Sequence, residues 1–169
     1  KTIVLIGYRQ GIATLVRYNN KHLTYIDLID EWSDVTLDDQ GGIWLLTRNR
    51  GIYMLSEDFA WLLQNTFSGR HIYYTGLDTF WILTEHQVYR WDKGNPKSVP
   101  VMIEGVTFSL GGQVYETSSG NVLIVAENGI WKVDGYYAEE VTLPIGVKIL
   151  GSKSDFDEDS DILFATTGY

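Results

Sequence analysis

The chain has 169 residues, 44% of them hydrophobic and 14% aromatic, which excludes a disordered chain and favours one globular unit. Its 22 Asp and Glu outnumber its 13 Lys and Arg, and the formal net charge of -9 disfavours nucleic acid as a partner because it repels phosphate backbones. The absence of cysteine excludes a disulfide framework, a thiolate zinc site and a cysteine nucleophile.

The apolar runs of the chain are short. Ile3 to Ile6 and Ile43 to Leu46 are typical, and a membrane-spanning helix needs about 20 apolar residues, so we expect no span here. The chain opens on Lys1 and Thr2 rather than on Met, so we expect a processed or excised piece whose targeting signal is no longer present.

One apolar run recurs along the chain about every forty residues. Its copies centre on Leu5, Leu45, Ile82, Ile124 and Phe164, which are separated by 40, 37, 42 and 40 positions. Each run is rich in β-branched and aromatic residues and has polar residues at its ends, which favours a strand buried on both faces over an amphipathic helix. A turn and a second strand-like stretch follow each run, so every repeat is a set of hairpins.

The four strands expected in each repeat are lettered A to D in chain order. In the second repeat they are Asp34 to Leu37, Ile43 to Thr47, Ile52 to Leu55 and about Phe59 to Leu63. In the third they are Ile72 to Thr75, Phe80 to Thr84, Val88 to Trp91 and about Val99 to Ile103. In the fourth they are Gln113 to Glu116, Val122 to Ala126, Ile130 to Val133 and about Ala138 to Leu143. The nearest helix candidate, Ser56 to Gln64, is too short to convince.

Four antiparallel strands in each repeat of about 40 residues predict an all-β fold made of β-propeller blades. We expect a single propeller segment over residues 1–169, with repeats at about 1–31 (partial), 32–68, 69–109, 110–145 and 146–169 (partial). A segment of a larger propeller is favoured over a closed four-bladed ring, because Ile3 to Gly7 and Ile162 to Thr166 would compete for one place. Expressed alone, such a segment should expose blade faces and associate.

The stretch Asp39 to Tyr53 resembles the two-component regulator propeller repeat, through the turn Gly41-Gly42, the pair Ile43-Trp44, Thr47 and the pair Gly51-Ile52. Ser118 to Asp134 resembles it nearly as well. Other copies depart from the pattern: Asp78-Thr79-Phe80 replaces the glycine turn, Gln87 replaces a glycine, Leu123 replaces the Trp, and Gly7 replaces the Thr.

This resemblance implies a bacterial extracytoplasmic input domain, periplasmic or extracellular, which senses carbohydrate or other nutrient fragments without catalysis and without a cofactor. The partners that it implies are a small-molecule or oligosaccharide ligand, the remaining blades, and an adjoining signalling domain. A membrane would be reached only through parts outside this chain.

Aromatic residues recur at fixed places in the repeat. Trp44 and Trp81 share one position of strand B, and Tyr53, Tyr89 and Trp131 share one position of strand C. They could stack on sugar rings, but their recurrence in every repeat favours packing between blades.

Ligands of propellers usually meet the end where the B–C and D–A loops emerge, because these loops surround the central channel. The candidate ligand-binding residues on the B–C loops are Tyr8, Arg9, Arg48, Arg50, Glu85, His86 and Glu127. Planar guanidinium groups suit carboxylates and sulfates. The alternative is that these arginines are solvated loop charges paired with Glu85 and Glu127.

Four aspartates at alternate positions, Asp155, Asp157, Asp159 and Asp161, are a weak candidate for calcium. Ser160 stands where the helix-loop-helix calcium motif needs Gly, and Thr166 stands where it needs Glu, so a solvated hairpin loop is favoured and we expect no metal.

Enzymatic motifs are also missing. His22 lies in the first repeat and His71 and His86 lie in the third, without a metal-ligand spacing, and there is no nucleophile elbow or phosphate-binding loop. A pair of carboxylates for glycoside hydrolysis stays open, but nothing in the sequence selects one. We therefore expect a non-catalytic ligand-sensing propeller segment; the alternatives are a propeller lectin that binds several sugars per ring and a protein-interaction scaffold.

Overall fold

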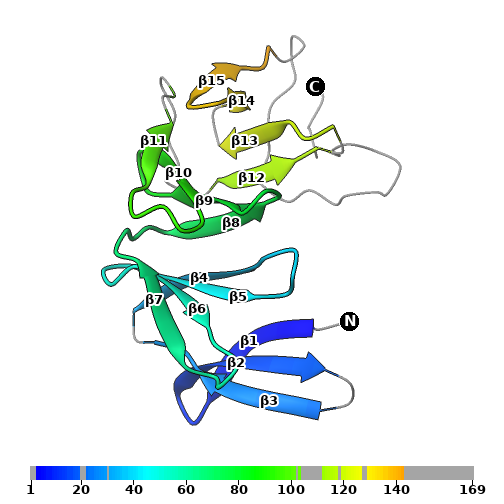
Figure 1. Ribbon diagram of the computed structural model, residues 1–169, viewed down its shortest axis with the longest axis vertical. Helices are drawn as coiled ribbons and strands as arrows, with labels where there is room; N and C mark the ends of the chain where they lie inside the picture. The colour runs from blue at the N-terminus through cyan, green and yellow to red at the C-terminus, as the bar shows by residue number, and fades with distance from the viewer. Residues whose placement is uncertain are drawn as a thin grey trace, which may run out of the picture.

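The computed structural model describes residues 3–19, 22–29, 31–101, 103, 112–117, 119–126 and 129–142. Their regular structure is entirely β: strands β1 to β15 form four antiparallel sheets, and these residues include no helix, hence none that could cross a membrane. Figure 1 shows the sheets following one another in chain order along the long axis of the molecule. The expected all-β architecture of antiparallel blades is confirmed.

Each sheet is a meander and is called a blade here. Blade 1 contains β1 (Ile3–Arg9), β2 (Ile12–Asn19) and β3 (His22–Asp27). Blade 2 contains β4 (Trp32–Leu37), β5 (Ile43–Thr47), β6 (Ile52–Leu55) and β7 (Trp61–Asn65). Blade 3 contains β8 (His71–Thr75), β9 (Thr79–Leu83), β10 (Val88–Asp92) and β11 (Val99–Val101). Blade 4 contains β12 (Gln113–Glu116), β13 (Val122–Ala126), β14 (Gly129–Asp134) and β15 (Tyr137–Glu140).

The A strands of blades 2, 3 and 4 lie next to one another, since β4 packs against β8 and β8 against β12. In blade 1, β1 corresponds to strand B, as the sequence predicted, and no described strand pairs with its free edge. The expected B strand at Ile162 to Thr166 lies outside the described residues, and the limits of the repeats stay a prediction.

The hydrophobic core lies between the blades. Blade 1 contributes Leu15, Ile26 and Leu28 to a cluster with Ile43 and Leu45 of blade 2. Because successive side chains of a strand point to opposite faces, the next residues of β5 face the other way. They form the cluster with blade 3, which contains Trp44, Leu46, Ile52, Ile72, Phe80, Ile82 and Trp91. All five residues of β5 and of β9 are buried, as expected for strands covered on both faces.

The recurring aromatics belong to these clusters. Trp44 and Trp81 are 0% and 2% exposed. Tyr53, Tyr89 and Trp131 lie on the face of their own blade that meets the preceding blade, and they pack against blades 1, 2 and 3 respectively. Their expected role in packing between blades is confirmed.

Threonine at the end of strand B holds the B–C loop in place. Thr47 Oγ1 donates to the carbonyl of Gly51 at 2.9 Å and accepts from the amide of Arg50 at 3.0 Å. Thr84 repeats this with both backbone groups of Gln87, and β9 ends at Leu83, one residue earlier than expected. The side chain of each Thr thereby fixes the loop that follows it.

Strand D of blade 2 is shifted from its expected limits. Strand D of blade 2 begins at Trp61 rather than near Phe59, because Phe59 has a φ of 60° and its amide donates to Ser56 O at 3.1 Å. The hydroxyl of Ser56 also accepts from the amide of Ala60 at 3.0 Å, so a tight turn occupies these positions.

Candidate ligand cleft between two blades

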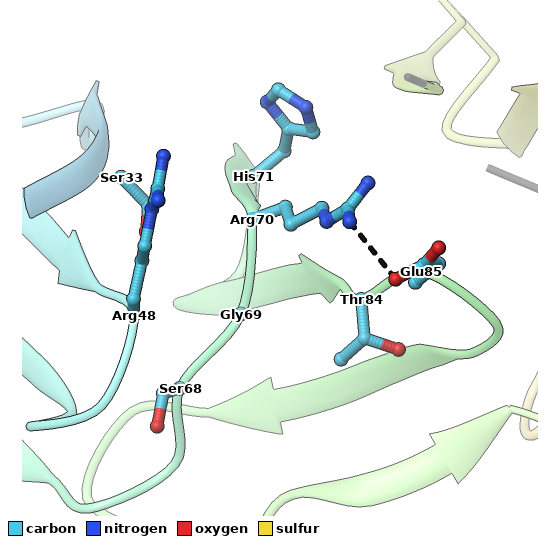
Figure 2. A pocket seen from close by; sticks show the side chains of 8 residues that line it. All are labelled: Ser33, Arg48, Ser68, Gly69, Arg70, His71, Thr84 and Glu85. Carbon is cyan, nitrogen blue, oxygen red and sulfur yellow. Dashed lines mark hydrogen bonds and ion pairs between the residues drawn. The ribbon is translucent and has the colours of Figure 1, made fainter. Parts of the chain in front are cut away.

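A cleft of about 630 Å³ opens between blades 2 and 3. Figure 2 shows the residues that line it: Ser33, Arg48, Ser68, Gly69, Arg70, His71, Thr84 and Glu85. They come from the starts of the A strands, from the B–C loops and from the D–A connection between β7 and β8. The cleft therefore lies at the end of the blades where the sequence placed the ligand site.

Arg48 forms one wall of the cleft. Its amide donates to the carbonyl of Glu31 at 2.9 Å, and the carboxylate of Glu31 accepts from Asn49 Nδ2 at 3.1 Å. Glu31 has a φ of 65°, a left-handed conformation that is strained for a residue with a Cβ atom. Glu31 thus holds the backbone of Arg48 and the side chain of the next residue, while Arg48 is exposed and its guanidinium makes no hydrogen bond or ion pair with any described residue.

Ser33 lies beside Arg48 and occupies a β-bulge. The pairing of β4 with β5 shifts register between Trp32 and Asp34, so Ser33 is the extra residue. A bulge turns a side chain away from the regular alternation of its strand, and here Ser33 is brought to the cleft. Its hydroxyl is buried and has no hydrogen-bond partner.

The opposite wall carries an ion pair. Arg70 and Glu85 approach to 2.9 Å, with about half of each side chain exposed, and Figure 2 shows Arg70 extending away from Arg48 toward Glu85. The amide of Arg70 donates to Leu83 O at 2.8 Å, which ties the D–A connection to β9. An exposed pair of this kind contributes little to stability, about 0–1 kcal/mol.

Gly69 lies between the two walls and allows a close approach. A Cβ atom at this position would lie 2.6 Å from Ile82 Cγ2 and 3.0 Å from Leu83 O. Any side chain would push the D–A connection away from β9 and change the shape of the cleft.

His71 and Asp34 join the A strands of the two blades at the edge of the cleft. His71 Nδ1 lies 3.4 Å from Asp34 Oδ2, and the same oxygen accepts from the amide of Ile72 at 3.1 Å. Asp34 Oδ1 accepts from the amide of Val35 at 2.9 Å. The carboxylate of Asp34 therefore links β4 to β8 and sets the separation of the two blades here.

The structure brings together two of the residues that the sequence selected, Arg48 and Glu85. Arg50 and His86 belong to the same two loops but do not line the cleft. Tyr8 and Arg9 lie at the end of β1 in blade 1. Glu127 and the aspartates Asp155, Asp157, Asp159 and Asp161 lie outside the described residues.

The partners expected for the loop arginines differ from those found. Glu85 pairs with Arg70, and Arg9 pairs with Asp27 at 3.1 Å while its guanidinium lies 5.6 Å from the centre of the Tyr25 ring. Within the described ranges no three His, Asp or Glu side chains form a group that could hold a metal ion.

The residues of the D–A connection were missed by sequence reasoning. Ser68, Gly69 and Arg70 lie in a stretch that the repeat pattern assigns to a D–A loop, and D–A loops were expected at the ligand end. Placing this connection by its position in the repeat, as was done for the B–C loops, would have selected all three.

The fold is that of β-propeller proteins, as solved structures confirm. Virginiamycin B lyase from Staphylococcus aureus is similar with a TM-score of 0.60 and 15% identity, over 79% of this chain and 50% of that one. An auxiliary nutrient binding protein from Bacteroides ovatus has a TM-score of 0.61 and 15% identity, over 93% and 47%. The extracellular domain of a proposed one-component system from B. thetaiotaomicron has a TM-score of 0.60 and 13% identity, over 88% and 23%.

The chain thus spans half or less of the length of these proteins. No protein-family model matches the sequence, and no curated protein matches it.

Proposed function

We propose that this chain is part of a larger bacterial β-propeller that binds a small ligand, such as a saccharide, without converting it, and that reports this binding to an adjoining signalling domain. The observation that carries the proposal is the polar cleft between blades 2 and 3, where the B–C loops and a D–A connection meet. The similar structures include a nutrient binding protein and a sensor's extracellular domain, which supports a binding role and a periplasmic or extracellular location.

A sensor is favoured over a propeller lectin. A lectin of this fold would present an aromatic platform in each blade, but Trp44, Trp81 and Trp131 are buried between the blades. Buried rings cannot stack on sugars. We therefore expect one ligand for this cleft rather than a separate sugar on each blade.

The proposal is tested by isothermal titration calorimetry of the protein against a panel of nutrient oligosaccharides. Ser68→Trp fills the cleft, and Gln64→Trp adds the same side chain on β7 outside the cleft. We expect a stoichiometry of one ligand, loss of binding with Ser68→Trp and unchanged binding with Gln64→Trp. Several equal sites would favour the lectin, and the absence of any binding would favour the interaction scaffold.

A catalytic role is the second candidate, because one observation favours it. His71 Nδ1 lies 3.4 Å from Asp34 Oδ2 at the edge of the cleft, where a carboxylate could orient the imidazole of a general base, and one of the similar structures is a lyase. Incubation of the protein with each bound saccharide, followed by chromatography, separates the two roles. We expect the saccharide unchanged; turnover that is lost in His71→Gln would establish the enzyme instead.

A further inference from the structure

The arginines of the chain differ in whether a carboxylate contacts them. Arg9, Arg70 and Arg90 each contact a carboxylate at 2.9 to 3.1 Å. Arg48 lines the cleft and has no such partner among the described residues, although the chain carries 22 acidic residues. A guanidinium left unpaired in so acidic a chain is available to an anion from outside.

Comparison of equivalent positions in blades 2 and 3 shows how their loop charges differ. Thr47 and Thr84 hold equivalent positions, so Arg48 of blade 2 is the counterpart of Glu85 of blade 3. Glu85 is neutralised by Arg70 across the D–A connection. Glu31 approaches Arg48 only through its backbone carbonyl, and its carboxylate binds Asn49 instead. Among the described residues, one wall of the cleft therefore holds a guanidinium paired with a carboxylate, and the other holds a guanidinium that no carboxylate contacts.

A second unsatisfied group lies in the same wall. Ser33 Oγ is buried without a hydrogen-bond partner, and such groups are uncommon in folded proteins. Ser33 and Arg48 are brought together by two departures from regular backbone geometry. These are the bulge at Ser33 and the positive φ of Glu31.

Hydrogen-bonding groups line the rest of the cleft. Glu85 has one oxygen bonded to Arg70 and a second that can accept from a ligand hydroxyl, and Ser68 adds another polar side chain. The lining residues include no Trp, Tyr or Phe that could stack on an uncharged sugar ring. The recognition chemistry is therefore a cation on one wall and hydrogen-bonding groups elsewhere in the cleft.

We infer that the cleft is specific for an acidic saccharide, whose carboxylate or sulfate group binds Arg48 while its hydroxyls face Glu85 and Ser68. This inference rests on the proposed function, since it names the ligand class of the same site. A carboxylate and a sulfate would use the same bidentate contact, and the experiment distinguishes them.

The test is calorimetry of the protein with four probes: an oligogalacturonate, its neutral methyl ester, a sulfated galactan oligosaccharide and inorganic sulfate. The variant is Arg48→Gln. The matched control is Arg50→Gln, an exposed arginine two residues away that does not line the cleft. We expect Arg48→Gln to weaken binding of the charged oligosaccharide on the order of tenfold or more, equal to ~1.4 kcal/mol, and Arg50→Gln to leave it within about twofold.

The probes also identify the anion. Preference for the oligogalacturonate assigns a carboxylate, and preference for the galactan oligosaccharide assigns a sulfate; in both cases added salt weakens binding. If the methyl ester binds as tightly as the oligogalacturonate and Arg48→Gln has no effect, the inference is overturned. The proposed function still stands in that case if Ser68→Trp abolishes binding of the methyl ester. Binding of inorganic sulfate as tightly as of either oligosaccharide overturns the saccharide part. Failure of every saccharide, charged or neutral, overturns the inference and the proposed function together.

Discussion

Trp44 donates a hydrogen bond from its indole Nε1 to Asp38 Oδ2 at 2.9 Å. Blade 3 contains the same arrangement, in which Trp81 Nε1 donates to Thr75 Oγ1 at 2.8 Å. In both blades the indole of strand B bonds to the polar residue at the end of strand A. The side chain that fills the space between blades therefore also holds the A–B turn of its own blade.

Replacing Trp44 with Ala should lower the free energy of unfolding by about 3–5 kcal/mol, because it leaves a large cavity against Phe80 and Trp91. Urea unfolding followed by circular dichroism measures this loss. Tyr137→Ala, at a residue 69% exposed, is the control and should change stability by less than about 0.5 kcal/mol. A loss below about 1 kcal/mol accompanied by loss of ligand binding would assign Trp44 to the ligand instead.

Asp38→Ala should destabilise the protein by roughly 1–3 kcal/mol, because three donors lose their acceptor. These are the amides of Gln40 and Gly42, at 3.1 and 2.6 Å, and the indole of Trp44. Asp58→Ala removes an exposed carboxylate from another turn and should have little effect. Equal midpoints of urea unfolding for the two variants would show that the turn does not depend on this carboxylate.

The blades were predictable because their signal is local. Runs such as Ile43 to Thr47 carry their own strand pattern, and a period near forty residues shows that the strands belong to repeated sheets. The cleft depends instead on register. A one-residue bulge at Ser33 and the pairing of Arg70 with Glu85 follow from how two strands align, which no spacing in the sequence records. The sequence selected Arg48 because its loop position recurs in each repeat. That no described carboxylate contacts its guanidinium depends on Glu31, whose carboxylate binds Asn49 instead.

Gly69→Ala should both destabilise the protein and weaken binding at the cleft. The new methyl group would meet Ile82 Cγ2 at 2.6 Å, and the nearby backbone oxygen of Leu83 cannot move without disturbing β9. We expect a loss of roughly 1–3 kcal/mol, the usual range for an overpacked site. Gly7→Ala is the matched control, since a Cβ atom on this β1 residue meets nothing within 4 Å. If both variants unfold at the same temperature, the close approach at Gly69 is not required.

Alkaline pH should destabilise the protein through Tyr73. Burial, and then the negative charge of Asp34, raise the pKa of Tyr73 above its ordinary value of 10.0, and its hydroxyl donates to Gly112 O at 2.6 Å. The folded protein keeps this phenol neutral where the unfolded chain would ionise it. The stability that it contributes is complete below pH 10 and is lost as the pH rises above that value, by up to ~1.4 kcal/mol per pH unit.

The measurement is urea unfolding between pH 8 and about 11. Tyr73→Phe should lower stability at pH 8 through the lost hydrogen bond but should show a shallower decline above pH 10 than the unaltered protein. Tyr137→Phe, at an exposed residue, should keep the original slope. Parallel curves for all three proteins would exclude a contribution from Tyr73.

The free face of blade 1 is apolar. Register places Leu5, Val16 and Tyr25 opposite one another on one face of the sheet, and Leu5 and Tyr25 are 62% and 50% exposed. The other face carries Leu15 and Ile26, which are buried against blade 2. A groove of about 530 Å³ lies beside β1 and is lined by Val4 to Ile6 and Val35 to Leu37. In blades 2 to 4 the corresponding edge of strand B is paired with an A strand.

This chain, expressed alone, should therefore self-associate through blade 1. Introducing Leu5→Lys and Leu23→Lys together places two charges on the free face. Sedimentation velocity over a range of concentrations should then show association weakened on the order of tenfold or more, because apolar contact area is lost and like charges meet. Leu77→Lys is the control: this leucine is 95% exposed but lies in the β8–β9 turn, so its replacement should leave association unchanged. A monodisperse monomer of the unaltered chain that melts cooperatively at every concentration would contradict the prediction, since it would mean that an open row of apolar side chains on a β-sheet is stable in water without a neighbouring blade.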